Sequence, residues 1–232
     1  MATVVLVRHA RSTANVSGVL TGRQKGVHLD DVGREQAQRV ARRLADVPLA
    51  ALVSSPLERC REMAAAIAEA QPNPVRVASE KGLVECDYGA WQGRALKELA
   101  REKLWKAVQR HPAGVTFPEG ESMAAMAARV AEAVRRHDTR VEAEHGPGAV
   151  WAAVTHGDPL KAVLADALGL HLDQFQRLHV DPASVSVVRL TAEATYVLQS
   201  NTHEGDLAWL APKGKRRPPR TGVVGGGAGP TH

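Results

Sequence analysis

The sequence predicts a three-layer α/β/α domain built on a mostly parallel central sheet. Three stretches are continuously apolar and rich in β-branched residues, a pattern typical of strands that are covered on both faces. Segments with helical periodicity lie between them, and this alternation favours parallel strands joined by helices. The chain has 232 residues and a hydrophobic content of 44%, enough for one substantial core. The expected strands cover residues 3–7, 51–54 and 149–155.

Local start and stop signals bound the expected helices. Ser55 as N-cap and Pro56 at the first helical position predict a helix start directly after the second strand. A Gly-Pro-Gly break at 146–148 precedes the third strand. Two β-rich runs, 185–190 and 195–198, predict a hairpin that adds an antiparallel strand at an edge. The expected helices cover residues 31–45, 56–70, 95–110, 122–144 and 159–168.

The net charge of +5 is confined to the end of the chain. Residues 211–232 hold five cations and no acid, so residues 1–210 are neutral. We expect residues 1–210 to form one domain and residues 211–232 a disordered tail, because the tail is rich in Pro and Gly and lacks apolar periodicity. Its basic run could attract RNA or acidic partners electrostatically, but it has no aromatic side chain to stack on bases. We therefore do not expect nucleic acid as a partner.

The sequence also predicts where in the cell the protein acts. It contains no run of eighteen or more apolar residues, so we expect no membrane span. Arg8 and Arg11 interrupt the first apolar run before a signal-like segment forms, which predicts a cytoplasmic protein. Cys60 and Cys86 are too few for a disulfide framework, and we expect both to be small buried or half-buried thiols.

Arg8 and His9, at the end of the first strand, are the first candidate site residues. Adjacent strand residues point to opposite faces, so both side chains enter one site only if the strand ends and the chain turns there. Ligands of open α/β sheets bind outside the carboxyl ends of the strands, which is where this turn must lie. An ordinary histidine bonded to the backbone would also explain His9, and this alternative stays open at this point.

Two further candidates follow the other strands. Arg59 lies one turn into a helix whose side chains lean toward its N-terminus, so its guanidinium can reach the same crevice and suits a phosphoryl group. Surface pairing with Glu58 or Glu62 would explain Arg59 as well. His156 stands at the end of the third strand, beside a helix start, as His9 stands at the end of the first. The other eight histidines, among them His179, are interpreted as surface or structural.

A glycine-punctuated loop carries the last candidate, Glu85, close to Tyr88 and Trp91. If the aromatic rings shield Glu85 from water, its protonated form is favoured, and a protonated carboxyl can act as a general acid. Taken alone the loop is uninformative, because a glutamate in a turn is usually solvated.

In combination these residues resemble the histidine phosphatase superfamily, in its phosphoglycerate-mutase-like branch. The resemblance spans roughly residues 3 to 200 and implies a phosphoglycerate-mutase-like fold with a small helical cap. Its motifs occur in the family's order. They are Arg8-His9-Ala10 with Ser12 and Asn15, the Ser-Pro-Leu-x-Arg helix start that ends at Arg59, Glu85 with Tyr88 and Gly89, and His156 with Gly157.

The resemblance implies a role for each residue. His9 would attack phosphorus and become phosphohistidine, and Glu85 would protonate the leaving alkoxide and then activate water. No metal or other cofactor is implied, and two arginines in the pocket would repel a divalent cation. The expected substrate is a small phosphorylated metabolite, and a homodimer is expected by analogy only. The residues expected to bind the phosphoryl group or the substrate are Arg8, Asn15, Thr21, Gly22, Arg59, Tyr88, His156 and Gly157.

Three functions are compatible with these residues. Hydrolysis of phosphomonoesters is favoured over a phosphoglycerate-type phosphomutase, because residues 94–121 lack the adjacent arginines of mutase relatives and their six basic residues follow the solvated face of a helix. A non-catalytic module that binds phospho-ligands would lack a nucleophile or an acid, and His9 and Glu85 are both present. Arg23 and Lys25 hint at an acidic substrate, although a charged loop is usually just solvated.

Overall fold

A single mixed sheet organises the part of the chain that the computed structural model describes, residues 2–211. The strand order is β3-β2-β4-β1-β5-β6. Neighbouring strands run parallel from β3 to β1, whereas β5 runs antiparallel to both β1 and β6. The predicted strands and the C-terminal hairpin are confirmed, and the short edge strand β3 was not predicted. The strands are β1 (Thr3–Arg8), β2 (Leu49–Ser54), β3 (Val77–Ser79), β4 (Val150–Thr155), β5 (Val185–Leu190) and β6 (Thr195–Thr202).

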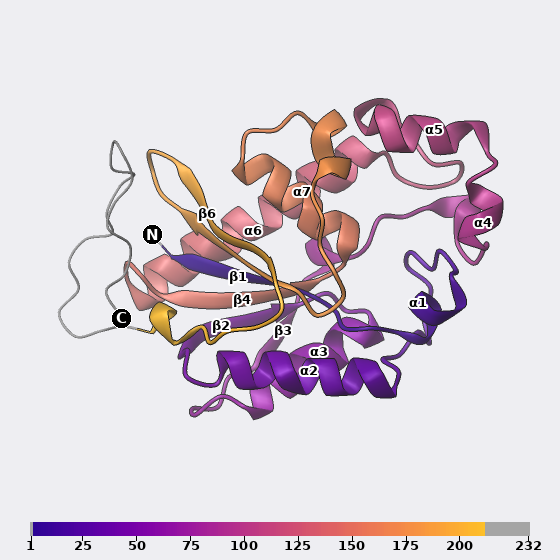
Figure 1. The fold of residues 1–232 in the computed structure, drawn as a ribbon. Helices are drawn as coiled ribbons and strands as arrows, with labels where there is room; N and C mark the ends of the chain where they lie inside the picture. Colours follow the sequence, from indigo (N-terminus) through magenta and orange to yellow (C-terminus); the bar gives the residue numbers. More distant parts are fainter. Residues whose placement is uncertain (1, 212–232) are drawn as a thin grey trace.

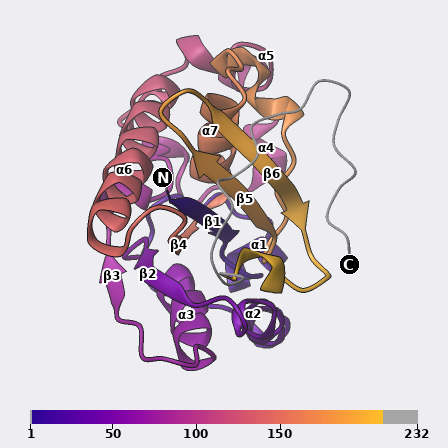
Figure 2. The ribbon, with the colours of Figure 1, turned by 90° about the vertical axis from the view of Figure 1, so that its left-hand side faces the viewer.

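Helices cover both faces of the sheet and complete the three predicted layers. Helices α6 (Met123–His145) and α7 (Gly157–Ala167) lie on one face, and α2 (Asp31–Leu44) and α3 (Glu58–Glu69) lie on the other (Figure 1). Figure 2 shows the same division from the side. Along β1, Val4 and Leu6 pack into the core beneath α6 and α7, while Val5 and Val7 pack beneath α2 and α3. Burial on both faces is the reason why β1 reads as a continuous apolar run.

Short helices form a cap near the carboxyl ends of the parallel strands (Figure 1). They are α1 (Thr13–Ser17), α4 (Leu96–Leu99) and α5 (Lys103–Arg110). The prediction of one helix over residues 95–110 was wrong, because the chain is extended at Glu102 between α4 and α5. Leu99 and Val108 are both buried. On one straight helix these residues, nine positions apart, would lie about 180° from each other, so the break lets both reach the core.

Two expectations concern the outer parts of the chain. The predicted tail, residues 211–232, lies outside the described residues except for Ala211, and the division into domains remains a prediction. Among the described residues, no helix is both long and apolar enough to cross a membrane.

Candidate active site

The carboxyl ends of β1 and β4 bring the two predicted histidines together. In the parallel register Arg8 lies opposite Thr155, so His9 and His156 follow at adjacent positions. The backbone N–H of His9 donates to the carbonyl of Thr155 at 2.9 Å. Their imidazole rings meet edge to face with centroids 5.2 Å apart. This end of the sheet is where open α/β folds place their ligands.

Hydrogen bonds fix the tautomer of His9. Nδ1 lies 2.8 Å from the carbonyl oxygen of Ala10, which can only accept, so Nδ1 carries the proton. Nε2 then holds a lone pair, and it accepts from Nε of Arg59 at 3.3 Å. Burial, together with the positive charges of Arg59 and Arg8, holds the pKa of His9 well below its usual value. His9 is therefore a neutral imidazole at neutral pH, with the lone pair of Nε2 at the site.

Two guanidiniums act on His9, that of the buried Arg59 and that of the half-buried Arg8. Arg59 is only 2% exposed, so the alternative of a surface ion pair with Glu58 or Glu62 does not hold. Its Nη2 donates to the carbonyl of Gly22 at 2.8 Å, and Nη1 of Arg8 donates to the carbonyl of Val180 at 2.7 Å. Within residues 2–211, Nη1 of Arg59 and Nε of Arg8 are buried without a hydrogen-bond partner. Two such cationic donors fit the oxygens of an anion.

His156 is fully buried next to His9 and does not border the cleft. Its Nε2 lies 2.8 Å from Oγ of Ser55, and Sγ of Cys60 lies 3.4 Å from the same nitrogen. The N-cap assigned to Ser55 was wrong. Helix α3 begins at Glu58 with Leu57 as N-cap, and the hydroxyl of Ser55 bonds to His156 and accepts only a long bond, 3.5 Å, from the N–H of Leu57. Burial, with Arg59 as the next cause, holds the pKa of His156 well below its usual value.

Glu85 enters the same cleft from the loop before the cap. Its Oε1 accepts from the backbone N–H of Cys86 at 2.9 Å. Burial raises the pKa of Glu85 to about 7, and the negative charge of Asp158 adds to the rise. The carboxyl is therefore partly protonated at neutral pH, as expected from its shielded surroundings.

Arg23, Arg129 and Glu121 form a cluster of charges that holds the backbone of the Glu85 loop. The carbonyl of Glu85 accepts from Nε of Arg23 and from Nη2 of Arg129, each at 3.0 Å. Glu121 joins the two arginines, accepting from Arg23 at 2.8 Å and from Arg129 at 2.7 Å. Its Oε1 also accepts from the backbone N–H of Asp87 at 2.9 Å. Arg23 therefore holds the loop, while Lys25 is exposed, and neither borders the cleft.

The remaining predicted residues all border the cleft. Oδ1 of Asn15 accepts from the N–H and the hydroxyl of Ser12, which leaves the amide nitrogen of Asn15 free to donate elsewhere. Gly22 has φ +51°, and a Cβ there would lie 2.3 Å from Oε1 of Gln92, so only glycine fits. Gly157 starts α7 against the guanidinium of Arg8. Thr21 and Tyr88 complete this set.

Several cleft residues were missed by the sequence analysis. Asp158 directly follows the His156-Gly157 motif and accepts from the hydroxyl of Tyr88 at 2.7 Å. A carboxylate beside a predicted site motif was the available signal for it. Trp105 and Lys161 also border the cleft, as does His179, which was interpreted as surface or structural. Nothing in local spacing marks these three, because the cap and α7 meet only in the folded chain.

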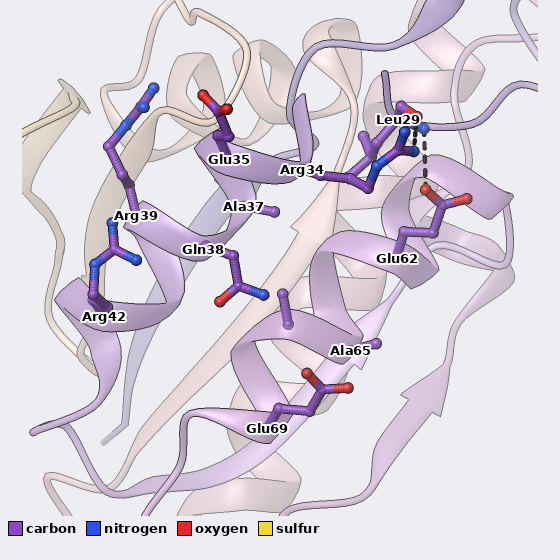
Figure 3. A pocket seen from close by; sticks show the side chains of 11 residues that line it. Leu29, Arg34, Glu35, Ala37, Gln38, Arg39, Arg42, Glu62, Ala65 and Glu69 are labelled. Atoms are coloured by element: carbon purple, nitrogen blue, oxygen red, sulfur yellow. Dashed lines mark hydrogen bonds between the residues drawn. The ribbon is translucent and has the colours of Figure 1, made fainter. Parts of the chain in front are cut away.

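The cleft has a volume of about 360 Å³, and a larger hollow of about 660 Å³ lies between α2 and α3. The second hollow contains none of the predicted site residues. Its walls are side chains of the two helices together with Leu29, and Arg34 and Glu62 both bond to the backbone of Leu29 (Figure 3). Chemistry therefore belongs to the smaller cleft. No group of three or more His, Cys, Asp or Glu side chains between residues 2 and 211 is arranged to hold a metal ion.

The three-layer fold and this cleft define a phosphoryl-binding α/β protein with a histidine between two arginines. The chain belongs to the histidine phosphatase superfamily, branch 1, whose profile it matches over residues 4–203. It is 32% identical over 207 residues to Phosphoserine phosphatase 1 of Hydrogenobacter thermophilus, covering 87% of this chain and 92% of the relative. It is also 32% identical to a probable phosphoglycerate mutase GpmB of Yersinia enterocolitica, over 81% of this chain and 85% of the relative.

A solved structure supports the same assignment. YhfR of Bacillus stearothermophilus superposes with a TM-score of 0.77 at 25% identity, over 90% of this chain and all of that one. The predicted fold class, a three-layer domain of the phosphoglycerate-mutase-like type, is confirmed.

Proposed function

We propose that the chain hydrolyses phosphomonoesters of small metabolites through a phosphohistidine at His9. The observation that carries the proposal is the neutral, buried imidazole of His9 beside two guanidiniums. Each guanidinium has a buried N–H group without a hydrogen-bond partner, and such donors favour binding of an anion. Phosphoryl transfer needs a positioned nucleophile and preorganised positive charge more than covalent assistance from further groups. The relative named phosphoserine phosphatase supports hydrolysis of a small phosphorylated metabolite.

In the first half-reaction the lone pair of His9 Nε2 attacks phosphorus, and the bond from phosphorus to the ester oxygen breaks. The electrons of that bond stay on the ester oxygen, which takes the proton of Glu85. Arg8, Arg59, the amide nitrogen of Asn15 and the backbone N–H of Gly157 hold the phosphoryl oxygens. Thr21, Gly22 and Tyr88 border the leaving alcohol.

In the second half-reaction water attacks the phosphohistidine. Glu85, now a carboxylate, takes a proton from this water, the bond from phosphorus to Nε2 breaks, and inorganic phosphate leaves. His156 supports the nucleophile. Its ring packs edge-on against His9 and is itself tied to Ser55. We assign it to the orientation of His9 rather than to direct contact with the phosphoryl group, because it does not border the cleft.

Mutase activity is the second candidate function, because one relative is named a probable phosphoglycerate mutase. The basic residues between positions 94 and 121 argue against mutase activity. Five of these six residues are exposed, Arg94 pairs with Glu102, and none of the six borders the cleft. A mutase must hold the second acidic end of its substrate, which these side chains do not reach. Incubation with 3-phosphoglycerate and its bisphosphate cofactor, followed by a search for 2-phosphoglycerate, tests this candidate.

The decisive test replaces the nucleophile. His9→Ala is expected to abolish turnover of p-nitrophenyl phosphate, and the wild-type chain quenched in alkali during turnover is expected to carry one phosphoryl group on the peptide that contains His9. Mass spectrometry detects the adduct. His145→Ala, which removes an exposed histidine at the end of α6 that does not border the cleft, is the matched control for folding. Undiminished turnover in His9→Ala would refute the mechanism.

We further propose that the reaction needs no added metal, that the protein acts in the cytoplasm and that it forms a homodimer. Assays with a chelator, fractionation of cells and light scattering of the purified protein test these statements one by one.

A further inference from the structure

The cleft extends well beyond the groups that would hold a phosphoryl group. At its inner end lie Arg8, His9 and Arg59. Farther out, α7 and the segment after it contribute Asp158, Lys161, Gln176 and His179. Six apolar residues make up part of the remaining lining, and we call them the cap wall. The cap wall consists of Leu20, Trp91, Leu96, Trp105, Val108 and Phe117.

Aromatic side chains are concentrated in this cleft. The chain has only eight Trp, Tyr and Phe residues, and four of them line the cleft. Their rings form one connected series. Tyr88 meets Phe117 at 5.0 Å, Phe117 meets Trp91 at 5.3 Å, and Trp91 stacks on Trp105 at 6.2 Å between ring centroids.

Trp105 ends this series on the side of solvent. Trp91 is 4% exposed, whereas Trp105 is half-buried and Leu96 is 40% exposed. A large apolar side chain at the rim of a cleft gains stability when a ligand covers it. The indole of Trp105, held in place by the stack on Trp91, therefore offers a fixed flat surface for a flat ring.

The charges between the inner end and this surface favour a neutral substrate body. Asp158 uses one carboxyl oxygen to accept from Tyr88, and its negative charge acts directly on Glu85. Glu85 must face the ester oxygen, so the carbon atoms next to that oxygen lie near Asp158. A carboxylate on those carbons would meet like charge, whereas a hydroxyl group could donate to Asp158.

Lys161 is the one lysine between residues 2 and 211 that borders the cleft, and it is already engaged. Nζ of Lys161 donates to Oε1 of Gln176 at 3.1 Å and lies 5.1 Å from the ring centroid of Phe175. It is therefore less free to bind a substrate carboxylate than an unpaired lysine would be. The volume of about 360 Å³ also exceeds what a phosphorylated three-carbon acid fills.

We propose that this cleft accepts phosphomonoesters of neutral, hydroxyl-bearing alcohols that end in a flat ring, the chemistry of a nucleoside 5′-monophosphate. This inference rests on the phosphatase function proposed above and names its substrate class. The phosphoryl group lies between Arg8 and Arg59, the hydroxyl groups face Asp158, and the ring stacks on Trp105.

Adenosine 5′-monophosphate and ribose 5-phosphate provide the sharpest comparison. Both release phosphate from the same primary alcohol, so they differ in the ring and hardly in chemical reactivity. Because stacking of a base on an aromatic side chain is a substantial interaction, kcat/KM is expected to be about tenfold or more higher for adenosine 5′-monophosphate. Phosphoserine and 3-phosphoglycerate are expected to fall below both.

Variants connect the preference to the residues. Trp105→Ala is expected to lower kcat/KM for adenosine 5′-monophosphate far more than for ribose 5-phosphate, and Trp105→Phe is expected to restore much of the difference. Trp209→Ala, a change at a 38% exposed tryptophan that does not border the cleft, is the control and leaves both rates unchanged. Asp158→Asn is expected to raise the ratio of phosphoserine to adenosine 5′-monophosphate turnover. A ratio within one variant cancels effects on the chemical step.

The outcomes separate this inference from the function on which it rests. If p-nitrophenyl phosphate is not hydrolysed and no phosphoenzyme forms, the proposed function falls, and the substrate class falls with it. If p-nitrophenyl phosphate is hydrolysed but phosphoserine, 3-phosphoglycerate or ribose 5-phosphate matches adenosine 5′-monophosphate, the substrate class alone is wrong. Equal affinity of His9→Ala for adenosine 5′-monophosphate and ribose 5-phosphate in binding titrations would also overturn it.

Discussion

Arg59 donates a hydrogen bond from Nε to Nε2 of His9 across 3.3 Å, so the second predicted motif bears directly on the first. The bond occupies the lone pair of Nε2, so it must give way when that lone pair attacks phosphorus. It also places a planar, fully charged donor where negative charge would develop on a transferred phosphoryl group. Arg59 is itself aimed by the carbonyl of Gly22, which accepts from Nη2 at 2.8 Å.

Arg59→Lys is expected to lower kcat/KM by a factor of about 10²–10³, because lysine keeps the charge but loses the planar fork. Steady-state kinetics with p-nitrophenyl phosphate measure the effect. Arg61→Lys, an exposed change on the same helix, is the control and should behave as wild type. Full activity in Arg59→Lys would contradict the assigned role.

Glu85→Gln is expected to affect poor leaving groups most. An alkyl phosphate needs a proton on its departing alkoxide, and we expect kcat/KM to fall by about 10²–10⁴ for ribose 5-phosphate. The fall should be much smaller for p-nitrophenyl phosphate, whose leaving group departs without a proton. Glu98→Gln, at an exposed position of α4, is the control. Equal losses on both substrates would mean that Glu85 is not the acid.

The pH dependence of kcat/KM should depend on Asp158. Glu85 must be protonated in the first half-reaction, and its pKa is raised to about 7. Activity on an alkyl phosphate should therefore decline as the pH rises through about 7. Asp158→Asn removes a negative charge that raises this pKa, so the decline should move to lower pH by roughly one unit.

Asp166→Asn serves as the matched control for this shift, because Asp166 lies on the same helix and pairs with Arg135 at the surface. The ionisation of the substrate is common to all three proteins and cancels in the comparison. An unmoved alkaline limb in Asp158→Asn would show that Asp158 does not tune Glu85.

Glu121 is expected to act as a positioning residue for Glu85. Glu121→Gln leaves Arg23 and Arg129 side by side without the carboxylate that joins them, so the carbonyl of Glu85 loses its fixed anchor. We expect kcat to fall about tenfold for ribose 5-phosphate and little for p-nitrophenyl phosphate, the pattern of a misplaced acid. Glu119→Gln, an exposed change in the same loop, is the control. A uniform loss on both substrates would indicate a merely structural role.

Features encoded by neighbouring residues were predictable from the sequence, whereas contacts between distant residues were not. His9 and His156 were predicted because each directly follows a buried strand, and parallel strands end at the same edge of a sheet. Ser55 illustrates the limit. Its place before Pro56 is a sound helix-start signal, but the shorter bond of its hydroxyl goes to His156, which is 101 positions away, and the N–H of Leu57 lies 3.5 Å from it. No local rule anticipates such a competitor.

By itself the sequence determined the layered fold and the place of two histidines at strand ends, because both are encoded in the periodicity of neighbouring residues. Arg59 and Glu85 became candidates only through the combined resemblance of the four motifs, and the structure decided that Arg59 is buried. Only the tertiary structure decided how the site is tuned and how far it extends. The charge cluster behind Glu85, the carboxylate of Asp158 beside it and the aromatic cap wall join segments far apart in the chain. Their mutual distances, which set charge interactions and ring stacking, exist only once those segments pack.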